Sequence, residues 1–258
     1  MTTRIEQSAE AAVARIVFCP EPETKPPTFD LQSLRSLEEA ICDVEKAGSA
    51  IRAVVISSKS EKHFLVGANI SALQALTANS IGDWVREGHR VFNRLQNLPV
   101  PVIALVNGNA LGGGLEVALA CDFLLATPQA RFGFPEPRLG LMTGWGGAYR
   151  LSRRVKIGVA RELLYTGRLI SSAEAREIGI CDVLGSLEDL HAWIEQFIGS
   201  LQDLAWSSIA ETKFQLLRIE EPNLELAREL EAEASCRLLK SPETLARLRD
   251  FFADRAHR

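Results

Sequence analysis

The stretch Leu111-Gly112-Gly113-Gly114-Leu115-Glu116 decides the local fold, because it joins a predicted strand to a predicted helix through three consecutive glycines. The apolar run before it, residues 102–106 (Val-Ile-Ala-Leu-Val), predicts a short buried strand. Residues 115–120 have the composition of a buried helical turn and a half. Glycines at such a junction leave the N–H groups of the first helical turn unobstructed, and that end of a helix favours a negative oxygen. Glu116 places a carboxylate beside this anion site.

A second carboxylate follows at another predicted strand end. Residues 130–136, Ala-Arg-Phe-Gly-Phe-Pro-Glu, predict a strand that finishes at Glu136, and Gly144-Trp145-Gly146-Gly147 opens a further helix. A glycine triplet alone is also compatible with a purely structural turn. Two carboxylates, each beside a glycine-rich helix start, favour an active site that transfers protons.

These motifs resemble those of the enoyl-CoA hydratase (crotonase) superfamily, and the resemblance extends from about residue 50 to the C-terminus. The motifs that carry it are an Asn-Gly pair, a Gly-Gly-Gly-x-Glu run, a Cys-Asp pair, Phe-Gly-x-Pro-Glu, a Gly-x-Gly-Gly helix start and an upstream Phe-x-x-Gly-Ala segment. In this chain they stand at Asn107-Gly108, Gly112 to Glu116, Cys121-Asp122, Phe132 to Glu136, Gly144 to Gly147 and Phe64 to Ile70.

The resemblance implies an α/β fold in which ββα units form a spiral, followed by a C-terminal α-helical oligomerisation subdomain. We expect the spiral core with the CoA-ester site in residues 1–200 and the helical subdomain in residues 201–258. In the latter part of the chain, apolar periodicity predicts helices over 187–201 and 224–238 and a third from Pro242 to Phe252.

The resemblance also assigns roles to single residues. Glu116 and Glu136 are implied to be catalytic, with Glu116 activating water and Glu136 protonating the α-carbon of the substrate. The N–H groups of Ala68 and Gly113 are implied to form an oxyanion hole. Further substrate-binding residues are implied at Gly67, Asn69, Ile70, Leu111, Gly112, Pro135, Gly144 and Trp145.

Two positions depart from the family pattern. Asn69 stands where Asp is common, and it retains the ability to cap the following backbone. Ser71 stands where a basic residue is frequent, so the contact that a basic side chain would make to a CoA phosphate is missing at this position.

The reaction implied is the addition of water to a 2-enoyl-CoA thioester, or the reverse dehydration. Alternatives on the same scaffold are double-bond isomerisation and hydrolysis of a thioester or ring. A member without catalysis that binds RNA is an alternative of a different class, against which the acidic balance and both glutamates speak. No cofactor is implied, since CoA is part of the substrate, and the family assembles as homotrimers or dimers of trimers.

Composition limits the remaining functions. A formal net charge of −4 over 258 residues argues against nucleic acid as a partner. The five cysteines include no Cys-x-x-Cys pair and the four histidines show no metal-ligand spacing, so we expect reduced thiols and no metal site. The N-terminus carries no apolar signal region, and no stretch is apolar enough for a membrane helix, so we expect a cytoplasmic protein without a membrane partner.

Two tryptophans and a basic run remain to be placed. Trp145, between glycines, either fills the acyl pocket or packs behind the helix start, and we favour the pocket. Trp84 lies on the apolar stripe of a helix predicted from residue 79, which is typical of the core. The basic residues Arg153, Arg154 and Lys156 are interpreted as a solvated helix face or a subunit contact.

Overall fold

The computed structural model describes residues 3–10, 12–77 and 80–218, together with the isolated positions 242, 244 and 246. The chain divides into two compact units, Met1–Gln196 and Phe197–Arg258. All the residues implied above to take part in chemistry lie in the first unit.

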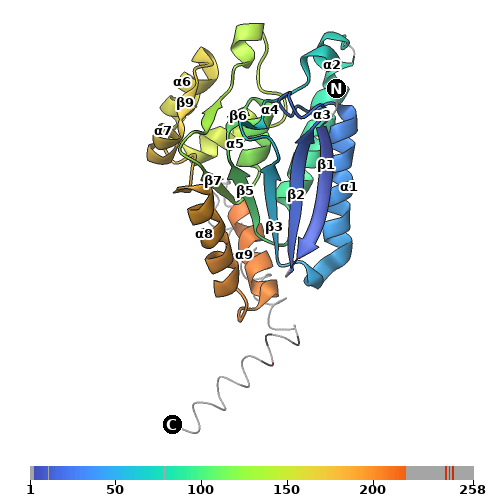
Figure 1. Ribbon diagram of the computed structural model, residues 1–258, viewed down its shortest axis with the longest axis vertical. Coiled ribbons are helices and arrows are strands. Elements are labelled where there is room, and N and C mark those ends of the chain that lie inside the picture. Colours follow the sequence, from blue (N-terminus) through green and yellow to red (C-terminus); the bar gives the residue numbers. More distant parts are fainter. Residues whose placement is uncertain are drawn as a thin grey trace. The chain divides into compact units, whose positions relative to one another are not determined.

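A six-stranded sheet forms the frame of the first unit (Figure 1). Only β1 is antiparallel to its neighbour β2, and the other strands pair in parallel. All five residues of β5 are buried, as expected of a strand covered on both faces. In spatial order the strands are β1 (Thr3–Glu10), β2 (Val13–Pro20), β3 (Ala53–Ser58), β5 (Val102–Val106), β7 (Phe123–Ala126) and β10 (Val183–Leu184).

A smaller sheet contains β4 (His63–Leu65), β6 (Asn109–Leu111), β8 (Arg131–Gly133) and β9 (Ile170–Ser171). Strands β4, β6 and β8 are parallel, so their C-terminal ends meet at one edge. In the pairs β3–β4, β5–β6 and β7–β8 the first strand joins the large sheet and the second joins the small one. The predicted spiral of ββα units is therefore confirmed.

Helices follow these strand pairs along the described part of the chain. The described α-helices are α1 (Leu31–Ala47), α2 (Ile70–Gln74), α3 (Ile81–Gln96), α4 (Gly113–Leu119), α5 (Gly147–Arg154), α6 (Ile157–Thr166), α7 (Ser172–Glu177), α8 (Leu187–Ser200) and α9 (Trp206–Arg218). Short 3₁₀ turns occupy η1 (Gly48–Ala50) and η2 (Glu136–Leu139). Within the part of the chain that the structure describes, no helix is long and apolar enough to cross a membrane.

Several predicted boundaries change. The strand expected to continue to Glu136 ends at Gly133, because Pro135 and Pro137 have no N–H for a strand ladder, and Glu136 instead begins η2. The predicted helix over 187–201 is α8, whereas α6 and α9 were not predicted. The helices expected over 224–238 and 242–252 lie outside the described residues, apart from three isolated positions.

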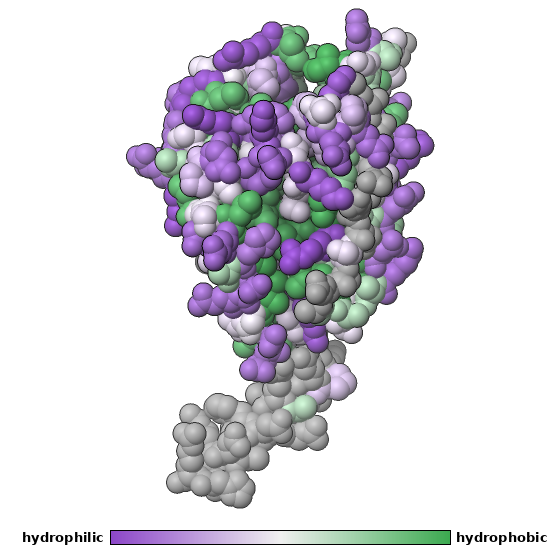
Figure 2. Space-filling view, in the orientation of Figure 1, coloured by the Kyte–Doolittle hydropathy of each residue, from purple (hydrophilic) through white to green (hydrophobic). Residues whose placement is uncertain are grey.

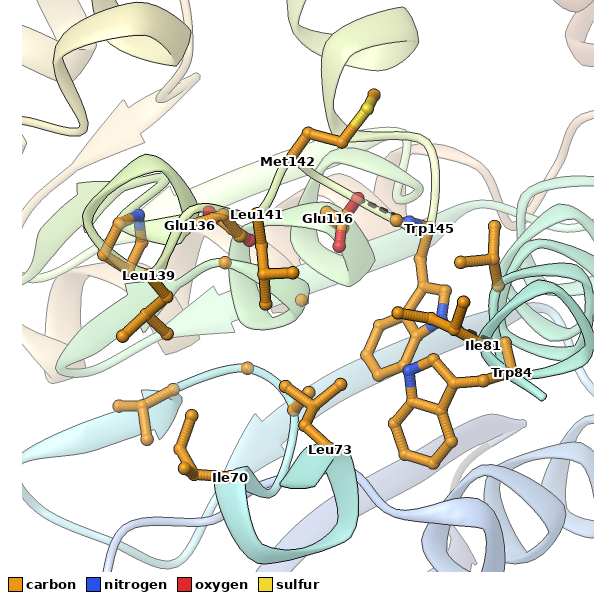
Figure 3. A pocket seen from close by; sticks show the side chains of 18 residues that line it. Ile70, Leu73, Ile81, Trp84, Glu116, Glu136, Leu139, Leu141, Met142 and Trp145 are labelled. Atoms are coloured by element: carbon orange, nitrogen blue, oxygen red, sulfur yellow. Dashed lines mark hydrogen bonds between the residues drawn. The ribbon is translucent and has the colours of Figure 1, made fainter. Parts of the chain in front are cut away.

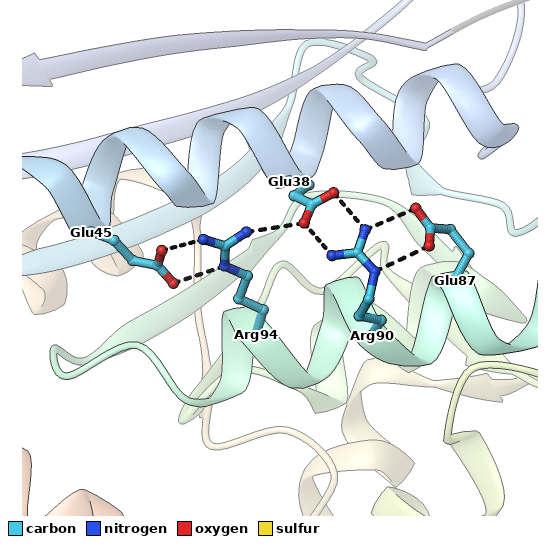
Figure 4. A network of polar contacts seen from close by, with 5 residues as sticks. All are labelled: Glu38, Glu45, Glu87, Arg90 and Arg94. Atoms are coloured by element: carbon cyan, nitrogen blue, oxygen red, sulfur yellow. Dashed lines mark hydrogen bonds and ion pairs between the residues drawn. The ribbon is translucent and has the colours of Figure 1, made fainter.

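Helix α3 is held to α1 by a chain of ion pairs on its solvent side (Figure 4). Arg90 bonds Glu38 and Glu87, and Arg94 bonds Glu38 and Glu45, with Nη1 of Arg94 3.0 Å from Oε1 of Glu38. The hydrogen bond from Arg90 lowers the pKa of Glu38. The opposite face of α3 buries Trp84, Val91, Phe92 and Leu95, so the helix is fixed from both sides.

Figure 2 shows one face of the molecule, in the orientation of Figure 1. This face is mainly hydrophilic, and its apolar residues gather across the middle.

Candidate active site

The site lies where β4, β6 and β8 end. Gly67 and Ala68 follow β4, Gly112 and Gly113 follow β6, and Glu136 follows β8. A Cβ atom added to Gly67, whose φ is +92°, would lie 3.3 Å from the nitrogen of Gly113 and 3.2 Å from the carbonyl oxygen of Leu111. Glycine is thus needed for the two turns to approach each other so closely.

Ala68 and Gly113 both line the resulting pocket. Phe29 donates its N–H to the carbonyl of Gly67 and accepts from the N–H of Asn69, at 2.8 and 2.7 Å. This parallel bridge uses the groups on either side of Ala68, so the N–H of Ala68 itself points away from Phe29. Gly113 is the first residue of α4, where an N–H has no partner inside the helix.

Glu116 lies in the first turn of α4 with only 2% of its surface exposed. Its Oε1 accepts the N–H groups of Trp145 and Gly147, at 2.7 and 2.8 Å, from the turn that opens α5. Burial raises the pKa of this carboxyl to about 7; the two N–H bonds and the charge of Arg150 lower the pKa, and the nearby Glu136 raises it. The carboxyl is therefore fixed in place with a pKa suited to proton transfer at neutral pH.

Glu136 lies at the start of η2, and its Oε2 is buried with no hydrogen-bond partner among the described residues. Burial raises the pKa of this carboxyl as well. A Cβ atom on Gly112, whose φ is +51°, would lie 2.7 Å from Oε1 of Glu136. The glycine triplet thus also makes room for the second carboxyl.

Figure 3 shows the pocket into which both carboxyls face, with a volume of about 120 Å³. All the predicted site residues line it except Asn69 and Leu111. Asn69 caps α2 instead, where its side chain accepts the N–H of Ala72 at 3.1 Å. Leu111 is the last residue of β6, paired with Gly133.

Trp145 combines the two placements that its sequence context allowed. The indole lines the pocket, but it is only 2% exposed and packs on Phe29, Phe92 and Trp84, with ring centroids 6.0, 5.5 and 5.4 Å away. Its Nε1 donates to the carbonyl of Trp84 at 3.2 Å. A Cβ atom on Gly88 would lie 2.1 Å from this indole, so a helix glycine provides its slot.

Several lining residues were not predicted. Trp84, which we interpreted as core only, is buried and also lines the pocket beside Trp145. Its position on the apolar stripe of α3 was visible in the sequence, but the stripe does not show which of its residues reach the site. The other lining residues not predicted are Val66, Leu73, Ile81, Val85, Leu139, Leu141 and Met142.

The arrangement defines a class of chemistry. Two backbone N–H groups beside a helix start suit an oxygen on which negative charge develops. The buried carboxyl of Glu116 and the partly buried carboxyl of Glu136, both with raised pKa values and on the same pocket, suit the movement of protons to and from neighbouring atoms. Together they describe a protein that can polarise a carbonyl compound and protonate or deprotonate it.

Comparison with known proteins shows the family to which the chain belongs. Residues 8–245 match the family model described as enoyl-CoA hydratase/isomerase. A short-chain-enoyl-CoA hydratase of Clostridium acetobutylicum is 34% identical over 202 residues, which are 78% of this chain and 77% of that protein. The chain therefore belongs to the enoyl-CoA hydratase/isomerase family.

Solved structures agree with this assignment. The crystal structure of enoyl-CoA hydratase from Bacillus anthracis superposes with a TM-score of 0.88 at 26% identity, covering 97% of this chain and 96% of that one. Enoyl-CoA hydratase from Thermoplasma volcanium gives a TM-score of 0.86 at 26% identity, covering 96% and 97%.

Proposed function

We propose that this protein is an enoyl-CoA hydratase, which adds water across the double bond of a 2-enoyl-CoA thioester or catalyses the reverse dehydration. The observation that carries the proposal is that Glu116, Glu136, Ala68 and Gly113 line one small pocket. The similarity to a short-chain-enoyl-CoA hydratase supports the same reaction.

In this proposal the thioester oxygen accepts hydrogen bonds from the N–H groups of Ala68 and Gly113. Attack on the β-carbon moves negative charge onto that oxygen, and donors already aimed at it need not reorganise during the reaction. Backbone donors suit this task because no side chain stands between Gly113 and the substrate.

The two carboxyls then share the proton transfers. Oε1 of Glu116 is occupied by the N–H groups of Trp145 and Gly147, which leaves Oε2 to orient and deprotonate the water. The water oxygen bonds to the β-carbon, and Glu136 delivers a proton to the α-carbon. Glu136 is suited to be the acid, because burial raises the pKa of its carboxyl more than the hydrogen bond from its own backbone N–H lowers it, and its Oε2 has no partner among the described residues. A proton then returns from Glu116 to Glu136 through the product site or solvent.

The acyl group that fits is short. The pocket of about 120 Å³ is small beside the roughly 300–1,000 Å³ of sites for drug-sized ligands. The paired indoles of Trp84 and Trp145 form one of its walls, and a slot in the core keeps Trp145 from moving aside. The exposed Ile70, Leu139 and Met142 lie at the pocket rim.

A panel of enoyl-CoA thioesters tests the proposal. Loss of the absorbance of the conjugated thioester, with a 3-hydroxyacyl-CoA identified as product, would support hydration. The same panel with 3-enoyl-CoAs measures isomerisation, and a thiol reagent detects CoA released by hydrolysis. Either of these activities without hydration would replace the proposal with the corresponding reaction.

A further inference from the structure

A buried arginine lies behind the turn that holds Glu116. Arg150 is in α5, and only 3% of its surface is exposed. Burial lowers the pKa of its guanidinium and the attraction of Glu116 raises it, but an arginine stays charged at neutral pH. Because a buried cation is costly unless it is paired and hydrogen-bonded, its partners indicate its role.

Those partners join the turn to α3. Nη1 of Arg150 donates to the carbonyl of Trp145 at 2.7 Å. Nη2 donates to Oδ1 of Asn93 at 2.6 Å, and Nε donates to Oε1 of Gln96 at 2.9 Å. Asn93 and Gln96 both belong to α3, the helix that the ion pairs of Figure 4 fix to α1. The guanidinium thus ties the turn to a firmly held element.

Glu116 and Arg150 hydrogen-bond to different backbone groups of the same turn, residues 145–147. The N–H groups of Trp145 and Gly147 bond Glu116, whereas the carbonyl of Trp145 bonds Arg150. Between them Gly146 has a φ of +101°, and a Cβ atom there would lie 2.2 Å from Nη1 of Arg150. Only glycine therefore lets the guanidinium reach the carbonyl.

We propose that Arg150 is a positioning residue for Glu116: it fixes the turn that presents two N–H groups to the carboxylate, and its buried charge favours the ionised form. The inference rests on the proposed function, in which ionised Glu116 activates water. Other charged or titratable groups face this pair. Glu136 of η2 faces Glu116. Arg150 is faced by Tyr149 of its own helix, by Cys121, which follows α4, and by His89 of α3.

The test compares Arg150→Gln, which removes the charge, with Arg150→Lys, which keeps the charge and loses the planar fork. Both should lower the kcat of hydration by roughly tenfold to a hundredfold, because a misplaced catalytic group costs that much. Binding of the CoA ester should change little. In Arg150→Gln the acid limb of the kcat profile should move to higher pH by roughly one unit, and by less in Arg150→Lys.

Arg154→Gln is the matched control. Arg154 lies on the same helix, and its guanidinium bonds Asp182 at 2.7 Å and the carbonyls of Cys121 and Asp122. Its side chain thus makes contacts inside the chain, and the expectation that Arg154 lies on a solvated helix face is wrong. Its loss should lower the Tm without moving the acid limb. An acid limb unchanged in Arg150→Gln would overturn the proposal.

Two further measurements keep the test decisive if Arg150→Gln does not fold. Asn93→Ala removes one anchor from an exposed position, so it should fold and lower kcat several-fold; an unchanged kcat would count against the proposal. The pKa of Glu116, read by NMR of ¹³C-labelled glutamate and assigned with Glu116→Gln, should rise in Asn93→Ala and Arg150→Lys. This titration needs no turnover, so it tests the role of Arg150 even if the wild-type protein hydrates no enoyl-CoA and the proposed function fails. A pKa of Glu116 that does not change in these variants would reject the inference.

Discussion

Replacing Trp145 with alanine should change both the stability of the fold and the choice of substrate. The indole is 2% exposed, has three aromatic neighbours and donates one hydrogen bond to a buried carbonyl. Truncation of a buried Trp costs about 3–5 kcal/mol, and these contacts favour the upper half of that range. With about 2–4 °C per kcal/mol for a chain of this size, the Tm should fall by roughly 8–20 °C.

The same substitution should lengthen the pocket. A methylene group in an apolar pocket is worth about 1–3 kcal/mol, so the ratio of kcat/KM for longer enoyl-CoAs to that for crotonyl-CoA should rise roughly tenfold or more. Initial rates on a series of chain lengths, measured well below the Tm of the variant, give this ratio. Trp145→Phe keeps more of the packing and should show a smaller change in both quantities.

Trp193→Ala serves as the control. Trp193 packs on Phe123 with ring centroids 5.5 Å apart, and it does not line the pocket. It should lose stability while the chain-length ratio stays at the wild-type value. If Trp145→Ala behaved in the same way, the indole would be a core residue only, and the reasoning about the pocket wall would be wrong.

Four other predictions concern the reaction, the packing and the assembly. Glu116→Gln and Glu136→Gln should each lower kcat by roughly a hundredfold or more while calorimetry shows unchanged acyl-CoA affinity; near-normal turnover would contradict the two-carboxyl mechanism. The wild-type kcat/KM should fall as pH drops below about 7, since Glu116 becomes protonated, and should fall again at high pH as Glu136 loses its proton; a flat profile would contradict this. Gly88→Ala places a methyl group 2.1 Å from the Trp145 indole, so it should lower the stability measured by urea unfolding. The control Gly82→Ala, on the same helix, meets only the flexible side chain of Arg86 at 3.4 Å and should be neutral or stabilise the protein by about 0.5–1 kcal/mol. The apolar helix faces predicted for 187–201 and 224–238 lead us to expect a trimer or hexamer in light scattering, and a monomer at micromolar concentration would refute this.

The parts of the site that the sequence predicted are those set by local chemistry. The glycine triplet is a short junction between β6 and α4, and a short junction allows few conformations. The positions of Gly113 and Glu116 are therefore fixed once β6 and α4 have formed. Gly67 and Ala68, which follow β4, were implied by the family resemblance of the segment Phe64 to Ile70. Such features lie within short, continuous stretches of the sequence.

What the sequence did not predict depends on contacts between distant segments. Trp84 and Trp145 are 61 positions apart. Neither the apolar stripe that contains Trp84 nor the glycines that flank Trp145 indicate that the two rings are in contact. Arg150 stands just before a run of basic residues that reads as solvent-facing, yet it is buried because Gly146 leaves room for it and α3 supplies two amide acceptors. A strand pattern also continued through Pro135, where missing N–H groups end the ladder.

The use of main-chain N–H groups that we propose for this site has a consequence for mutational surveys. An alanine scan tests only side chains, so it leaves Ala68 unchanged and cannot remove the N–H groups of Trp145 and Gly147 that hold Glu116. At Gly113 the scan would add a Cβ atom 2.5 Å from the Trp145 indole, and the defect would report a steric collision instead of a lost donor. Replacing single peptide bonds by esters, which deletes one N–H and keeps the shape of the chain, is the perturbation that would reveal this half of the site.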